Sequence, residues 1–426
     1  MSSVTTFEAG CVDALAIFEE ETELHHQRQM RKEYLEEFAR RDEELIMAHS
    51  RTCPTCKHRL HRHGKTKGTE IITAFGKVKI RLIRLRCRSC GFLITPGRLL
   101  IPLGSVTALA SERMCDLVSK MPYGKAADSL FKQHRIKLSD KKYWEVVQTE
   151  ASSIEDVLAK RAERLYTYGE PPPSVDLERK KPLVIGIDGG HIAHWKNTEG
   201  HESFEVKCVT MATGSLPGPG KKRHLRDRVG YSADTDTQTF GQRVSALALS
   251  CGYMSASKTI FISDGAKWIP ELIDTYFPGS THLLDMYHLK RRIQDTFTRR
   301  DFGCLACYRR NALAAADAYK PLLLLHILTL WKPTEQRRLE LREELIEYVS
   351  NNLKAIAAHR TSHLHGSGWI EKGVDLMISR RLKNRGMSWT RPGASHMIGF
   401  EVLLYNNEWE QYWKQRRGQE SIREAA

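Results

Sequence analysis

Three acidic residues in the second half of the chain have the setting of metal ligands. Asp188 and Asp264 each follow an apolar, strand-like run, and Glu371 stands in the first turn of a helix-like segment. A carboxylate at a strand tip is costly to bury unless it meets a cation or water. Three such groups together repel one another unless divalent metal lies between them. The pattern therefore predicts a site for Mg²⁺ (or Mn²⁺) that assists phosphodiester cleavage.

The surroundings of the two aspartates favour this interpretation. Asp188 is followed by Gly189 and Gly190, and Asp264 by Gly265, so substrate backbone can approach closely. Both preceding runs are apolar throughout, which is typical of central strands in a sheet. Two neighbouring strands would then set the two carboxylates within reach of one metal.

The third ligand is less sharply defined. Glu371 flanks an apolar helical stripe and could point along the sheet edge toward the aspartates. It could also do no more than complement the helix dipole. Asp375, one helical turn later, is the alternative third ligand.

A second acidic position follows another strand-like run, Thr281–Leu284. Asp285 and His288 are separated by two residues. The pair could position substrate or a phosphate, or the two side chains could simply hydrogen-bond each other.

Two cysteine pairs in the first quarter of the chain predict a structural zinc ribbon. Each Cys-x-x-Cys knuckle places two thiolates on a tight turn, and four thiolates complete a tetrahedral shell for Zn²⁺. Redox-active cysteines are the alternative. A β-hairpin across Ile71–Leu85, with its turn at Phe75–Lys77, can fill the span between the knuckles. The predicted zinc ligands are Cys53, Cys56, Cys87 and Cys90. A further pair, Cys304 and Cys307, is interpreted as a structural pair in the core.

Composition points to a polyanionic partner. The 426-residue chain carries a formal net charge of +15, which favours nucleic acid first and an anionic membrane second. No run is long and apolar enough to span a bilayer, and the start of the chain does not read as a signal peptide. Clustered cysteines fit a reducing compartment, so we expect a cytoplasmic, nucleoid-associated protein. The basic residues expected at the DNA backbone are Lys57, Arg59, Arg62, Lys290, Arg291, Arg380, Arg381, Lys383 and Arg385.

Changes in periodicity divide the chain. A helical segment (1–50) precedes the zinc ribbon (51–104) and a helical, helix-turn-helix-like DNA-binding region (105–168), in which Ser139 is an expected N-cap. A proline-rich linker at 169–174 marks a boundary. Beyond it, mixed strands and helices predict an α/β or α+β core, interrupted by helices over about 289–359. Residues 401–426 are expected to be a helical tail.

Taken as a set, four motifs resemble DDE transposases of bacterial insertion sequences with Mutator-like catalytic domains. They are IGIDGG around Asp188, FISDGAKWI around Asp264, DMYHLKRR around Asp285 and His288, and GSGWIEKGVDLMISRRLKNRGMSWT around Glu371. The resemblance covers about residues 182–400.

The resemblance implies an RNase H-like catalytic domain with a helical insertion before the final glutamate. It implies Mg²⁺-dependent cutting of transposon ends and strand transfer into target DNA, by a homo-oligomer on double-stranded DNA. Asp188, Asp264 and Glu371 match the catalytic triad, and Asp285 and His288 match an accessory pair. The family often has cysteine where this chain has Asp285, which leaves Asp285 a competitor for the second catalytic position.

Two other functions fit some of the residues. One is a zinc-ribbon DNA-binding regulator whose nuclease-like core is inactive. The other is a glycoside hydrolase with paired carboxylates, against which the basic charge and the cysteine pairs argue.

Overall fold

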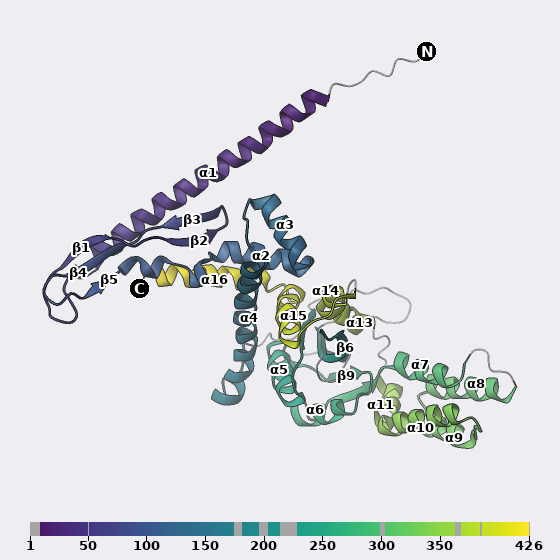
Figure 1. Cartoon of the computed structure of the whole chain (residues 1–426). Coiled ribbons are helices and arrows are strands. Elements are labelled where there is room, and N and C mark those ends of the chain that lie inside the picture. The colour runs from purple at the N-terminus through teal and green to yellow at the C-terminus, as the bar shows by residue number, and fades with distance from the viewer. Residues whose placement is uncertain are drawn as a thin grey trace, which may run out of the picture. The chain divides into compact units, whose positions relative to one another are not determined.

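The protein is described by a computed structural model, which divides into two compact units. The first unit holds residues 1–150 and 409–426, and the second holds residues 151–408. Within these, the structure describes residues 9–49, 51–173, 181–195, 203–213, 228–298, 303–362, 368–383 and 386–425. Figure 1 shows their helices and strands along the chain.

The first unit combines a long helix, two small sheets and a set of shorter helices. Its elements are α1 (Ala9–Ala48), β1 (Leu60–Lys65), β2 (Thr69–Thr73), β3 (Gly76–Ile80), β4 (Ile83–Cys87), β5 (Leu93–Ile94), η1 (Pro96–Leu100), η2 (Leu103–Ser105), α2 (Ala108–Lys120), α3 (Tyr123–His134), α4 (Asp140–Tyr168, which continues into the second unit) and α16 (Trp409–Ala425).

Helix α1 confirms the helical prediction for the start of the chain, and its second half packs on the strands. Phe38 joins a core cluster with Ile71 and Val78 of the β2–β3 hairpin. Asp42 is buried, and its Oδ2 accepts a hydrogen bond of 2.9 Å from the Ile83 amide. Both small sheets therefore pack against helix α1.

The structure bears out two local predictions in this unit, one of them with different bounds. Strands β2 and β3 form a hairpin between the knuckles and pair antiparallel from Thr69↔Ile80 to Thr73↔Gly76, but the predicted second arm does not reach Leu85, because Ile83–Cys87 is β4 and pairs with β1. The Ser139 hydroxyl accepts a hydrogen bond of 3.3 Å from the Lys142 amide, which confirms the N-cap of α4. Helix α16 packs on α2, and Arg416 forms a buried ion pair with Glu150 at 3.1 Å (Figure 1).

The second unit is a mixed α/β domain with a helical lobe. Its elements are β6 (Leu183–Ala193), β7 (Ser203–Thr213), β8 (Arg228–Ala233), α5 (Thr237–Ser250), η3 (Tyr253–Ser255), β9 (Thr259–Ser263), α6 (Trp268–Tyr276), β10 (Thr281–Leu284), α7 (Met286–Thr296), α8 (Cys304–Asp317), α9 (Pro321–Leu330), α10 (Gln336–Asn351), α11 (Leu353–Ala357), α12 (His359–Ser362), α13 (Gly368–Val374), the π-helical segment η4 (Asp375–Ser379), α14 (Arg380–Leu382) and α15 (Arg391–Tyr405).

Five strands of this unit form one sheet in the order β10-β9-β6-β7-β8. Strands β6, β7 and β8 pair antiparallel, whereas β9 and β10 run parallel to β6. Strand β9 and the first half of β6 are buried and mostly apolar, as their sequences predicted, whereas β10 is buried only at Leu283 and Leu284. Because the three strands run the same way and in register, Asp188 within β6 lies level with the residues that follow β9 and β10.

Helix α13 lies directly on one face of this sheet because the residues beneath it are small. A Cβ on Gly186 of β6 would lie 2.3 Å from Cγ1 of Ile370, and a Cβ on Gly373 would lie 2.1 Å from Cγ2 of Thr210. The opposite face is covered by α5, where Phe240 packs on Tyr231 at 5.9 Å between ring centroids. The sheet is thus sandwiched between helices.

Helices α7 to α11 form a lobe with its own apolar core, built around residues such as Phe297, Leu324 and Ile356 (Figure 1). In its described residues, the segment expected to be a helical insertion consists of helices joined by short non-helical stretches. In the described part of the chain, we find no helix with the length and hydropathy needed to cross a bilayer.

The close approach of α13 to β6 yields a stability prediction. We expect Gly186→Ala to lower the free energy of unfolding by about 1–3 kcal/mol, because the new methyl group overlaps Ile370 and pushes α13 from the sheet. Chemical denaturation measures the change. Gly124→Ala is the control, because a Cβ there meets nothing within 4 Å. Equal stability of the two variants would contradict the packing.

Candidate functional site

Strand register places three aspartates in one row. Ile187 pairs with Ser263 across β6 and β9, and Ser263 pairs with Leu284 across β9 and β10. Each of these three residues is followed by an aspartate. Asp188 follows Ile187, Asp264 follows Ser263, and Asp285 follows Leu284. The Asp285 amide donates to the Ser263 carbonyl at 2.7 Å, so the row is maintained past the end of β10. The register therefore sets three carboxylates side by side. Asp264 and Asp285 follow the ends of their strands as predicted, whereas Asp188 lies within β6, which continues to Ala193 because it pairs with β7 over its whole length.

The environment of Asp188 perturbs its carboxyl group. Its pKa is raised to about 6, chiefly by burial and also by the charges of Asp264 and Asp285, against the Gly189 amide and His288, which lower it. The Gly189 amide donates to Asp188 Oδ1 at 2.7 Å. Asp188 is a half-buried carboxylate with two acidic neighbours. A bound cation would offset both the cost of burying its charge and the repulsion from those neighbours.

The other two aspartates are fixed by hydrogen bonds at the starts of their turns. Asp264 Oδ1 accepts from the Ala266 amide at 3.1 Å. Asp285 caps α7, its Oδ1 accepting from the Tyr287 amide at 2.9 Å, and its Oδ2 lies 3.7 Å from Nε2 of His288. Asp285 is therefore engaged as a helix cap with His288 beside it, which leaves Asp264 the more available ligand.

Glu371 stands on the helix that covers this face of the sheet. Ile370, its neighbour, packs over Gly186, which precedes Asp188 by two residues on the same face of β6. Glu371 itself is exposed. The rival residue Asp375 is already paired with Lys372 at 2.7 Å and Arg380 at 3.1 Å, and the Lys372 hydrogen bond lowers its pKa. Asp375 is thus already neutralised by two basic side chains, and Glu371 remains the predicted third carboxylate.

The acidic row does not close into a compact cluster. Among the described residues, the one group of three or more metal-ligating side chains whose ligand atoms all lie within 4.8 Å is formed by cysteines. The charges of Asp264, Asp285 and His288 act on Asp188, whereas Glu371 is an exposed residue of α13.

That compact group is the predicted ribbon set, Cys53, Cys56, Cys87 and Cys90. Its Sγ atoms include pairs at 3.5 Å (Cys53 and Cys90) and 3.4 Å (Cys56 and Cys87). Tetrahedral zinc with bonds of about 2.3 Å requires Sγ atoms about 3.8 Å apart, close to these separations. Four thiols at such spacing fit one Zn²⁺.

The two knuckles are built alike. The Cys53 and Cys87 carbonyls accept from amides four residues later, at 3.0 Å from both Lys57 and Gly91. Those two residues adopt left-handed φ values of 62° and 77°. Gly91 takes this conformation freely, as the sequence suggested, whereas Lys57 does so at a steric cost. The same turn in both knuckles indicates that they bind one metal ion together.

The predicted DNA contacts have different surroundings. Lys57, Arg59, Arg291 and Lys383 are exposed, and Arg385 lies outside the described residues. Three others are ion-paired: Arg62 with Glu43, Lys290 with Asp317 and Arg380 with Asp375.

Two expectations are wrong. Arg381 is 5% exposed and lies over the Trp389 ring at 4.9 Å, so it packs inside the unit and is not available to a phosphate. Cys304 and Cys307 are not in the core, because both are exposed at the start of α8. Sequence reasoning also missed Tyr348 and Asn352, which contact the Asp264 turn from the helical lobe.

Fold and site together define a mixed α/β protein with a row of carboxylates at a sheet edge and a separate four-cysteine cluster. The chain belongs to the Uncharacterised protein family (UPF0236), whose model matches residues 175–416. No curated protein matches it. One similar solved structure is the Drosophila P element transposase strand transfer complex, at 10% identity and a TM-score of 0.23, covering 75% of this chain and 82% of that one.

The cysteine cluster predicts dependence on zinc. We expect Cys87→Ser to lose bound zinc and to destabilise residues 51–104, because three thiolates leave the tetrahedral shell incomplete. Metal analysis and limited proteolysis measure both effects. Cys304→Ser, which alters an exposed cysteine elsewhere, should keep its zinc. A full zinc content in Cys87→Ser would refute the ribbon.

The raised pKa of Asp188 predicts a pH-dependent stability change in protein free of Mg²⁺. A carboxyl that binds its proton more tightly when folded stabilises fully below about pH 4 and loses that contribution as pH rises through about 6. Asp188→Asn should therefore be more stable than wild type at pH 8, by about 1–2 kcal/mol after allowance for partial exposure, and by less at pH 5.

Denaturant unfolding at the two pH values measures this difference. Asp295→Asn, at an exposed position on α7, is the matched control and should show no such pH dependence. If Asp188→Asn gained no stability at pH 8, the ionised Asp188 carboxylate would not destabilise the folded state as its burial implies.

Proposed function

We propose that this protein is a DNA transposase that binds insertion-sequence ends and catalyses metal-dependent phosphodiester cleavage and strand transfer. The observation that carries the proposal is the row of Asp188, Asp264 and Asp285 at the edge of three neighbouring parallel strands. A five-stranded mixed sheet followed by a helical lobe and then a glutamate-bearing helix is the order that the DDE resemblance implies, and we propose an RNase H-like fold on that ground.

Asp188, Asp264 and Glu371 are the residues that would hold divalent metal. When bound, Mg²⁺ or Mn²⁺ would activate a water or a DNA 3′-hydroxyl and stabilise the leaving oxygen. The carboxylates suit this role because oxygen ligands bind Mg²⁺ and because the pKa of Asp188, about 6, leaves it ionised at neutral pH. Asp285, through its cap on α7, would keep His288 beside the row as an accessory residue.

DNA contact is supported by charge and by exposure. The net charge of +15 favours a polyanion, and phosphate contacts supply most of the affinity in proteins of this kind. Exposed Lys57 and Arg59 beside the first knuckle, and Arg291 on α7, are available to the DNA backbone. We propose double-stranded DNA, transposon ends and target alike, as the partner, bound by a homo-oligomer.

The test is incubation of the full chain with DNA that flanks its own coding region, in Mg²⁺, followed by mapping of nicks at nucleotide resolution. We expect wild type to cut at defined ends. Asp188→Asn and Glu371→Gln should keep DNA affinity and lose cleavage by at least about a hundredfold, because each removes a metal ligand.

Asp375→Asn is the matched control for Glu371→Gln, because it lies one turn away and is already ion-paired. It should cleave at nearly the wild-type rate. An active Glu371→Gln with an inactive Asp375→Asn would move the third ligand to Asp375. Binding without any metal-dependent cleavage by wild type would instead indicate a DNA-binding regulator with an inactive core.

A further inference from the structure

We propose that Tyr348 and Asn352, on the helical lobe, are positioning residues that hold the Asp264 carboxylate in the metal-binding row. The inference rests on the proposed function for its catalytic consequence. Neither side chain belongs to the acidic row, and both lie more than eighty residues after Asp264 in sequence. They act through the backbone of the turn that follows β9.

Two hydrogen bonds join the lobe to this turn. The Tyr348 hydroxyl donates to the Asp264 carbonyl at 2.6 Å. The Asn352 side-chain amide donates to the Gly265 carbonyl at 3.5 Å and to the Tyr348 carbonyl at 2.9 Å. Tyr348 is 9% exposed and Asn352 is 2% exposed, so water competes poorly for either bond. The C-terminal end of helix α10 thus holds two successive carbonyls, those of Asp264 and Gly265, beside the Asp264 carboxylate.

The turn itself has little room to move. Gly265 has φ +82°, and a Cβ there would lie 2.6 Å from Leu284 Cδ1 and 2.9 Å from the Asn352 amide nitrogen. The turn is therefore wedged between the end of β10 and Asn352. Because the Ala266 amide donates to Asp264 Oδ1 at 3.1 Å, fixing the turn also fixes the carboxylate.

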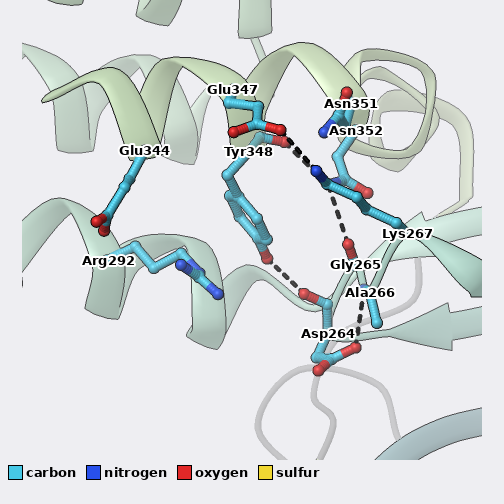
Figure 2. A pocket seen from close by; sticks show the side chains of 10 residues that line it. All are labelled: Asp264, Gly265, Ala266, Lys267, Arg292, Glu344, Glu347, Tyr348, Asn351 and Asn352. Atoms are coloured by element: carbon cyan, nitrogen blue, oxygen red, sulfur yellow. Dashed lines mark hydrogen bonds and ion pairs between the residues drawn. The ribbon is translucent and has the colours of Figure 1, made fainter. Parts of the chain in front are cut away.

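Tyr348 is itself fixed from the other side. The Arg292 guanidinium of α7 lies 4.3 Å from the centroid of its ring (Figure 2). Burial raises the pKa of the Tyr348 hydroxyl well above its usual value, so it remains a donor across the working pH range. Helix α7 begins at the Asp285 cap, so this contact links the helix that follows Asp285 to the residue that holds the Asp264 turn.

A pocket of about 350 Å³ opens beside these contacts, lined by Asp264, Arg292 and Tyr348 among others (Figure 2). Lys267 and Glu347 form an ion pair across the same region at 2.7 Å, but both side chains are mostly exposed. Exposed pairs contribute little, whereas loss of the Tyr348 donor leaves a shielded carbonyl unpaired. Tyr348 is therefore the residue to alter.

Tyr348→Phe removes only the donor and keeps the ring beneath Arg292. Tyr308→Phe is the matched control, because its hydroxyl donates to the Leu330 carbonyl within the lobe, away from the acidic row. The first measurement is hydrogen exchange of the Ala266 amide in protein free of metal and DNA. We expect exchange about fivefold faster in Tyr348→Phe, the ratio equivalent to about 1 kcal/mol, and unchanged in Tyr308→Phe.

Mn²⁺ binding by electron paramagnetic resonance and the Mg²⁺ dependence of cleavage follow. Tyr348→Phe should bind Mn²⁺ several-fold more weakly and need several-fold more Mg²⁺ for half-maximal cleavage, with its rate recovered at high metal and its DNA affinity unchanged. A role in lobe stability alone would not shift metal dependence.

Unchanged Ala266 exchange, or an unchanged metal requirement, in Tyr348→Phe would overturn the inference. Faster exchange together with weaker Mn²⁺ binding would support it even if wild type cut no DNA, and that lack of cleavage would count against the proposed function alone.

Discussion

Three aspartates set side by side across neighbouring parallel strands are the constraint around which the second unit is built. Asp188, Asp264 and Asp285 are set in one row by strand register, and a shift by one residue would turn every side chain to the other face. Apolar strands buried on both faces forbid that shift. The row therefore carries an electrostatic cost that the fold cannot relax: burial is the main cause of the raised pKa of Asp188, and the charges of Asp264 and Asp285 add to it.

Two further parts of the unit approach this row. Helix α13, which carries the exposed Glu371, is seated on β6 through Gly186, which lets Ile370 reach the sheet. The helical lobe approaches from beyond β9 and β10, and Tyr348 and Asn352 reach the Asp264 turn from there. Segments that are distant in sequence thus pack around the strands and the turn that carry these like charges.

Much of this arrangement could be predicted from local sequence. The runs before Asp188 and Asp264 were recognisable as strands because they are almost entirely apolar, and the knuckles because two Cys-x-x-Cys pairs lie thirty residues apart, whereas the pair at Cys304 has no partner pair. Strand β8 was missed because Arg228–Ala233 has no comparable apolar run at the sheet edge.

Other features depend on packing that no local pattern encodes. Arg381 looks like part of a basic surface cluster, yet it is buried against Trp389. Cys304 and Cys307 have the spacing of buried helix positions, yet α8 turns them outward. The contacts of Tyr348 and Asn352 span 84 and 87 residues, and the π-helical segment after α13 has no recognised sequence signal.

The central claim is that folding gathers the side chains at 188, 264 and 371 around divalent metal. A crystal of the protein with Mn²⁺ and end DNA, measured at the manganese absorption edge, tests this most directly. We expect anomalous peaks bound by Asp188, Asp264 and Glu371. Anomalous density that avoids this edge of the sheet, or metal bound there while Glu371 points to solvent, would contradict the claim.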